Sequence, residues 1–320
     1  MALPLDVRDL VKSGSRYQKD REQTVRLAVI VEVDAPDELV DGVKERLRPL
    51  TSGASLQVEV ASPGSTPVVG PRLDAVVAVA GSGRSGLREA LVAPRQERVP
   101  VVVLARAPGH EASRYADDLA QPLSDVLVDD DLSRLLDVRL PRWLADEAPS
   151  KRLALAHNFA FMRRAVAEEA VTRTAWQNAL VGSLAVIPGA DMPIMTANQA
   201  KMLLEIAAAY GEHLGTERIK ELAAVVGGGF VFRTAARQAL GLVPVLGWAV
   251  KGGIGYGGTI AMGKAAIAYF EQGADLTSVA RKLKESAIEV SSKIPRRKQK
   301  AVLAEEQLML PGVSGDAAGE

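Results

Sequence analysis

Residues 176–211 read WQNALVGSLAVIPGADMPIMTANQAKMLLEIAAAYG, and this stretch decides how the second half of the chain folds. It overlaps Thr174–Ala190, an apolar segment of seventeen residues without a charge. Pro188 and Gly189 are expected to end this first helix, and Asp191 is expected to cap the next one. The segment is shorter than the roughly twenty apolar residues that cross a bilayer. We therefore predict a packed or re-entrant helical hairpin rather than a pair of membrane spans.

The region after this hairpin is also apolar, and it is richer in glycine. Eleven of the 28 glycines fall within Gly227–Gly263, so we expect helices that approach one another backbone to backbone. An amphipathic helix is predicted from Leu276 to about Val290. The basic cluster Lys293–Lys300 that follows can contact anionic lipid or an acidic partner, or can form a solvated tail.

The first half of the chain has the pattern of an α/β domain. Residues 1–25 are polar and lack periodicity, which predicts a flexible leader. Leu27–Val33 is then a continuous apolar run, typical of a strand that is covered on both faces. Further strands are predicted at 56–60, 74–80, 99–105 and 125–128, with helices at 36–48, 86–92 and 112–120. This alternation predicts a doubly wound, mostly parallel sheet.

One motif in this domain has the spacing of a nucleotide-binding loop. Gly81-Ser-Gly-Arg-Ser-Gly86 is a GxGxxG sequence after the third strand, which makes Gly81, Gly83, Arg84 and Gly86 weak candidates for a nucleotide or anion site. A dinucleotide fingerprint follows the first strand and has an acid at the end of the next strand, where this chain has Arg106. A flexible turn therefore remains the alternative.

The residues that a nucleotide-hydrolysing enzyme needs are missing. The loop after the first strand, Val33–Glu38, has no glycine and no lysine and carries three carboxylates, which excludes a P-loop. Leu104–Gly109 lies where a GTPase has its NKxD motif and contains none of those three residues. We expect no catalytic residue and no bound cofactor.

Metal chemistry is also disfavoured by the sequence. Cysteine is absent, and the three histidines, His110, His157 and His213, have no ligand spacing. Asp129–Asp131 is interpreted as a helix cap rather than a metal site, because the three acids are consecutive and precede a helical pattern.

The charge distribution limits the partners. The net charge is zero; the first 150 residues carry 24 acidic and 19 basic residues, and the rest carry 15 and 20. No basic stripe dominates the chain as a whole, so nucleic acid is not an expected partner. The basic residues Arg163, Arg164 and Arg173 precede the apolar segment and form either a solvated helix face or a flank on the cytoplasmic side of a membrane. No secretory signal is visible at the N-terminus, so we expect a cytoplasmic protein associated with the inner face of the cell membrane.

Several spaced motifs resemble a known family. The signature lies between residues 187 and 211 and includes Pro188, Gly189, Asp191, Pro193, Gln199, Met202, Tyr210 and Gly211. Together with the later Leu240–Gly247 and Gly258–Gly263, it resembles the YcjF-type domain-of-unknown-function family over about residues 151–272. The resemblance implies association with GTPase-like domains and with the inner membrane, and it suggests that the first domain is a degenerate GTPase-like domain.

These observations predict four regions: a leader over 1–25, an α/β domain over 26–148, a helical domain over 151–290 and a tail over 291–320. The predicted function is a non-catalytic, membrane-associated interaction or scaffold protein that has lost nucleotide hydrolysis. Its expected partners are another protein or a second copy, and an anionic membrane surface. The alternatives are a nucleotide-responsive switch or enzyme that uses Gly81–Gly86, and a soluble helical module for oligomerisation.

Overall fold

A computed structural model describes residues 7–65, 67, 70–84, 86–184, 192–215 and 248–272. The described residues form two compact units. The first contains residues 7–174 and 201–215, and the second contains residues 175–184, 192–200 and 248–272. Both helices of the predicted hairpin take part in both units, because the division falls within each of them.

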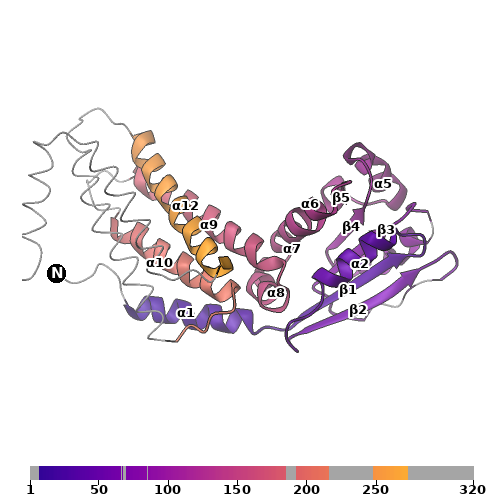
Figure 1. Ribbon diagram of the computed structural model, residues 1–320, viewed down its shortest axis with the longest axis horizontal. Helices are drawn as coiled ribbons and strands as arrows, with labels where there is room; N and C mark the ends of the chain where they lie inside the picture. The colour runs from indigo at the N-terminus through magenta and orange to yellow at the C-terminus, as the bar shows by residue number, and fades with distance from the viewer. Residues whose placement is uncertain are drawn as a thin grey trace, which may run out of the picture. The chain divides into compact units, whose positions relative to one another are not determined.

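A five-stranded parallel sheet forms the centre of the first unit (Figure 1). Its strands are β1 (Val25–Glu32), β2 (Ala54–Ala61), β3 (Ala75–Ala80), β4 (Val101–Ala105) and β5 (Val126–Val128), and their order is β2-β1-β3-β4-β5. The register pairs Val29 of β1 with Val58 of β2 on one side and with Val77 of β3 on the other. The predicted doubly wound, parallel fold is confirmed.

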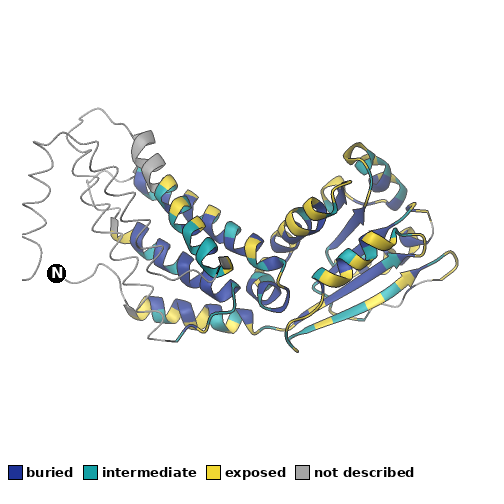
Figure 2. Cartoon of the chain, viewed as in Figure 1, coloured by how far each residue is buried: buried dark blue, intermediate teal, exposed yellow. Residues whose placement is uncertain are grey.

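Helices cover the two faces of the sheet, which explains why the central strands are apolar throughout. All residues of β3 and β4 are buried (Figure 2). One face packs against α3 (Leu87–Ala90) and α5 (Ala112–Leu119), with Leu87, Leu91 and Leu119 in the shared core, and α4 (Val92–Gln96) follows Leu91. The helix that follows β1 is α2 (Asp37–Arg46), which buries Leu39 and Val43.

The chain continues as helix beyond the sheet. The elements are α6 (Leu132–Arg134), a π-helical turn (Leu135–Arg139), α7 (Leu140–Glu147) and α8 (Arg152–Asn158). At the end of α8, the Asn158 carbonyl accepts a hydrogen bond from the Leu50 amide at 2.8 Å. Just before the helix begins, the Lys151 ammonium lies 3.9 Å from the Asp74 carboxylate. These contacts tie α8 to the sheet. The boundary predicted between residues 148 and 151 therefore does not separate the compact units, which divide inside α9 (Met162–Leu184).

Residues 7–21 correct the prediction of a flexible leader. They form a helix, α1 (Val7–Arg21), that buries Leu10 and Tyr17. Small and hydroxyl residues interrupt its apolar positions, and its buried face also includes Ser13 and Arg21. The buried positions are spaced by three and four residues, as in a helix, but only Leu10 and Tyr17 among them carry large apolar side chains.

The remaining helices are α10 (Met192–Ala209) and α12 (Trp248–Gln272). Within the described parts of the chain, none of the helices combines the length and the apolar content that a bilayer span requires. The predicted helix at 276–290 and the basic cluster at 293–300 lie outside the described residues.

Candidate functional site

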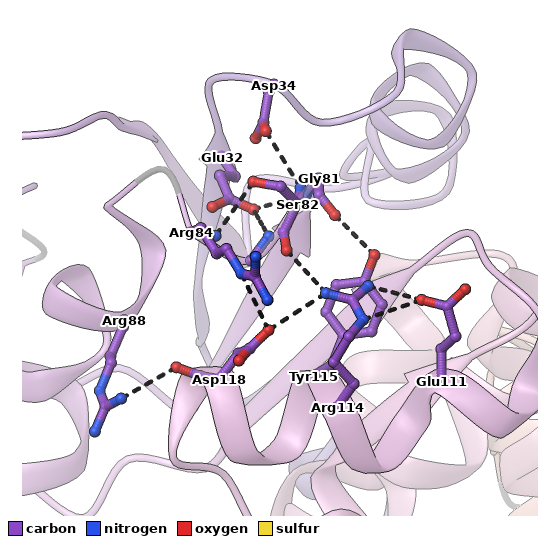
Figure 3. Close-up of polar contacts among 11 residues, drawn as sticks. Glu32, Asp34, Gly81, Ser82, Arg84, Arg88, Glu111, Arg114, Tyr115 and Asp118 are labelled. Carbon is purple, nitrogen blue, oxygen red and sulfur yellow. Dashed lines mark hydrogen bonds and ion pairs between the residues drawn. The ribbon is translucent and has the colours of Figure 1, made fainter.

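The strand order gives the sheet one switch point, which is the place where ligands of doubly wound folds bind. The chain leaves β1 toward β2 and leaves β3 toward β4, so the strand order reverses between β1 and β3. Ligands in such folds bind beyond the carboxyl ends of the strands at this switch point. The two loops there are the acidic loop after Glu32 and the GxGxxG turn from Gly81 to Gly86 (Figure 3).

A carboxylate of the chain itself accepts hydrogen bonds from the backbone amides of the GxGxxG turn. Glu32 is the last residue of β1 and is fully buried. One of its carboxylate oxygens accepts hydrogen bonds from the backbone amides of Gly81 at 2.8 Å and Gly83 at 2.9 Å. Asp34 accepts a further bond from the Ser82 amide at 3.3 Å. Successive backbone amides of this kind form an anion-binding concavity, and here the bound anion is internal.

The glycine spacing of the turn has a packing explanation. A Cβ on Gly81 would lie 2.4 Å from the Asp34 carbonyl oxygen, and one on Gly86 would lie 2.5 Å from the Ser62 carbonyl oxygen. Gly86 also has a φ of +94°, which side chains rarely adopt. The glycines therefore let the loops after β1, β2 and β3 touch. Close packing of these loops therefore accounts for the glycines of the turn without a bound nucleotide.

Helix α5 holds the other side of the turn. The Tyr115 hydroxyl donates to the Gly81 carbonyl at 2.8 Å, and the Arg114 guanidinium donates to the Ser82 carbonyl at 3.1 Å (Figure 3). Hydrogen bonds from Arg114 to the Glu111 carboxylate raise the pKa of this guanidinium further above its ordinary value. The turn is thus fixed by side chains from both flanking elements.

The structure brings all four candidates of the turn together, but it gives Arg84 an acidic partner. The Arg84 side chain is largely exposed, and its Nε lies 3.5 Å from an Asp118 carboxylate oxygen. Arg106, which stands where a dinucleotide-binding fold has its acid, forms an ion pair with Glu38. Both arginines therefore already have an anionic partner within the chain.

Sequence reasoning missed the residue that matters most at this turn. Glu32 is the only charged residue in the apolar run Leu27–Val33. A charge inside a fully buried strand needs a specific partner, and that signal was available. The roles of Arg114, Tyr115 and Asp118 could not be found in the same way, because they depend on how α5 lies against the turn.

One residue of the acidic triplet after β5 caps a helix, as predicted. Asp131 is the N-cap of α6, and its carboxylate accepts hydrogen bonds from the amides of Ser133 and Arg134. Asp129 is buried and receives two hydrogen bonds of 2.6 Å from the Arg134 guanidinium, which lower the pKa of Asp129 to about 2. Among the described residues, no group of three or more His, Asp or Glu side chains could hold a metal ion.

The family-like motif is described in part. Pro188, Gly189 and Asp191 lie outside the described residues, so the corner of the hairpin is not tested. Pro193 is exposed in the first turn of α10, and Met202 is buried in its middle. Tyr210 and Gly211 follow the helix. Gly211 has a φ of +88°, and its amide and the Glu212 amide bond back to the carbonyls of Ala208 and Ala207, which is a Schellman motif.

Gln199 belongs to a buried polar network in the second unit. Its amide nitrogen donates to the Thr259 hydroxyl at 2.9 Å, and the Asn178 amide nitrogen donates to the same oxygen at 3.0 Å. Asn198 donates in turn to the side-chain oxygen of Asn178 at 3.0 Å. The network joins α9, α10 and α12, and it fixes their register because a slip would leave buried amides without partners.

Two glycines of α12 show no close packing against the described part of the chain. A Cβ on Gly257 or Gly258 would meet no atom of the described residues within 4 Å. Most of the glycine-rich region for which close packing is predicted lies outside the described residues.

Within the first unit, helix α1 packs on α8 and is fastened to α10 and to the residues just after it. The Lys201 ammonium of α10 lies 2.6 Å from the Asp9 carboxylate, and Arg21 donates to the Glu212 carbonyl at 2.6 Å. Glu205 of α10 forms a 2.6 Å ion pair with Arg173 of α9. Burial, with Glu205 nearby, raises the pKa of Tyr17 to about 12. Lys201 thus docks α1 on α10, and Glu205 joins α10 to α9.

Comparison with known families adds one result. Residues 152–296 match the family described as domain of unknown function (DUF697). The match starts at the beginning of α8 and includes α9, α10 and α12. It agrees with the sequence resemblance at the level of a domain of unknown function. No curated protein matches the chain.

Proposed function

We propose that this protein is a non-catalytic, membrane-associated interaction or scaffold protein. Its helical half is a YcjF-type domain, and its α/β domain is a degenerate GTPase-like domain that has lost nucleotide hydrolysis. It acts in the cytoplasm at the inner face of the membrane, with another protein or a second copy as its partner. The relation to a GTPase rests on the resemblance of the helical half, because the strand order is shared with other doubly wound folds.

The proposal that the protein is non-catalytic rests on the turn at the switch point, whose backbone amides already bond to carboxylates of the chain. Phosphate sites at such turns work because free amides face the ligand. Here the amides of Gly81 and Gly83 already bond the buried Glu32, and Asp34 bonds the amide between them. A phosphate would have to displace one carboxylate and approach another. Repulsion between the anions opposes this step.

Calorimetry tests this part directly. GTP, ATP, NAD and NADP are each titrated into the full chain, and we expect no heat of binding for any of them. Saturable heat for one of the four would instead support the alternative, a nucleotide-responsive switch or enzyme that uses Gly81–Gly86.

The membrane part is tested by fractionation of cells with salt, carbonate and detergent washes. We expect the protein in the membrane fraction at low salt. Recovery of all of it in the soluble fraction at both low and high salt would refute membrane association.

An exposed apolar surface in the second unit favours the other alternative, a helical module that oligomerises. Trp176 is 64% exposed and Leu180 is 59% exposed, and the two lie one turn apart on α9. The Trp176 ring contacts the Tyr256 ring of α12 edge to face, with 5.2 Å between the ring centroids. Light scattering without detergent decides whether copies associate, and a concentration-dependent mass that Trp176→Ala abolishes would support self-association.

A further inference from the structure

The outward face of α1 carries a continuous stripe of positive charge. Its exposed residues include four cations, Arg8, Lys12, Arg16 and Lys19. At about 100° per residue these four lie within about 80° of the helix circumference. They extend over about 16 Å of the helix axis at 1.5 Å per residue. We call this set the basic face of α1.

The opposite side of the same helix is its packed side. The buried residues Leu10, Ser13, Tyr17 and Arg21 centre on the direction opposite to the basic face, and Figure 2 distinguishes the two sides of α1 by colour. The ion pair between Asp9 and Lys201 and the hydrogen bond from Arg21 to Glu212 hold the helix in this orientation. The basic face is therefore presented in a fixed direction.

We propose that the basic face of α1 is the surface that binds the headgroups of an anionic membrane. This inference rests on the proposed membrane association and names the contact that provides it. A helix that lies along a membrane surface needs cations in one row on the side toward the lipid, and each one near an anionic surface contributes about fivefold to binding.

The composition of the stripe favours lipid over nucleic acid. The only aromatic residue of α1 is Tyr17, which is buried on the packed side, so no ring is available to stack on a base. The chain has a net charge of zero, and its first 150 residues are acidic on balance. A nucleic acid that approaches the whole domain therefore feels no net long-range attraction. A flat membrane surface, in contrast, can contact the single row of cations on α1 alone.

Vesicle binding with the full chain tests the proposal. The triple variant Lys12→Gln, Arg16→Gln and Lys19→Gln removes three charges of the basic face and keeps helix-forming residues. The control Lys44→Gln, Arg48→Gln and Arg88→Gln removes three exposed charges elsewhere in the same unit. Each protein is sedimented with vesicles of phosphatidylcholine alone and with vesicles that also contain phosphatidylglycerol, at 0.1 M and 0.5 M salt. Circular dichroism verifies that the variants are folded.

The expected result is binding to the anionic vesicles that weakens with salt, falls about 100-fold in the triple variant and is unchanged in the control. Equal binding of the triple variant and the unmodified chain would overturn the proposal while membrane association stands. If the unmodified chain binds neither kind of vesicle, membrane association itself fails. If the triple variant loses affinity for a DNA duplex but not for vesicles, the surface is a nucleic-acid site and the proposal is wrong.

Discussion

Replacing Glu32 by alanine is the sharpest test of how the switch point is built. The change removes the carboxylate oxygen that accepts the amides of Gly81 and Gly83 at 2.8 and 2.9 Å. Glu32 is fully buried, so water cannot easily replace it without opening the turn. The variant therefore leaves two backbone donors without their partner.

The magnitude follows from these two donors. A buried donor that loses its acceptor costs about 1–3 kcal/mol. Gly83 is buried and takes the larger share, while Gly81 is half-buried. We expect Glu32→Ala to lower the free energy of unfolding by about 2–4 kcal/mol. Glu32→Gln keeps an acceptor oxygen but loses the charge, so its cost should be roughly half as large.

Urea unfolding followed by circular dichroism measures both variants, and Glu38→Ala is the control. Glu38 lies in the first turn of α2 and forms an exposed ion pair with Arg106, whose loss costs less than about 1 kcal/mol. Hydrogen exchange adds a local readout, because the amides of Gly81 and Gly83 should exchange faster in Glu32→Ala. If Glu32→Ala costs no more than Glu38→Ala and leaves this exchange unchanged, Glu32 does not hold the turn.

Three further predictions test other parts of the structure. Gly86→Ala should destabilise the chain by about 2 kcal/mol or more in urea unfolding, because its Cβ would collide with the Ser62 carbonyl at a φ of +94°; a loss below about 0.5 kcal/mol would contradict this packing. The lowered pKa of Asp129 stabilises the folded chain above pH 4, and this contribution should disappear as the pH falls toward 2. Asp129→Asn should therefore be less stable than the unmodified chain at pH 6, with a difference that shrinks by pH 2.5, and a constant difference would refute the assignment. Gly258→Ala should raise the melting temperature, since a Cβ there would meet no described residue within 4 Å and alanine favours the helix by up to about 1 kcal/mol; a decrease would mean that another surface packs there.

The α/β fold could be predicted because its signal is local. The apolar runs of β1, β3 and β4 are uninterrupted or nearly so, and the glycines and prolines between them mark the turns. Buried parallel strands require such runs. The strand order could not be predicted in the same way, since it depends on which strand edges meet after the crossovers form.

The sequence pointed to the GxGxxG turn as a candidate site, but it could not give the chemistry of this turn. The spacing of Gly81, Gly83 and Gly86 identified the turn, but the same spacing serves ligand binding and close packing of backbones. Only the position of Glu32 relative to the turn separates the two. That position depends on the β1–β3 register, in which Val31 pairs with Val79 and so brings the end of β1 beside Gly81.

Helix α1 shows why the limits of a domain match differ from the limits of a folded unit. The match to the domain of unknown function begins at residue 152, yet Lys201 and Glu212 within it bond to Asp9 and Arg21 of α1. The whole sheet, residues 25–128, therefore lies in the sequence between α1 and the helices on which α1 packs. A fragment that starts at residue 152 would lose the partner of Lys201 and uncover the surface that buries Leu10 and Tyr17. The basic face also depends on this docking, because α1 can present its cations in one direction only while its opposite side is held.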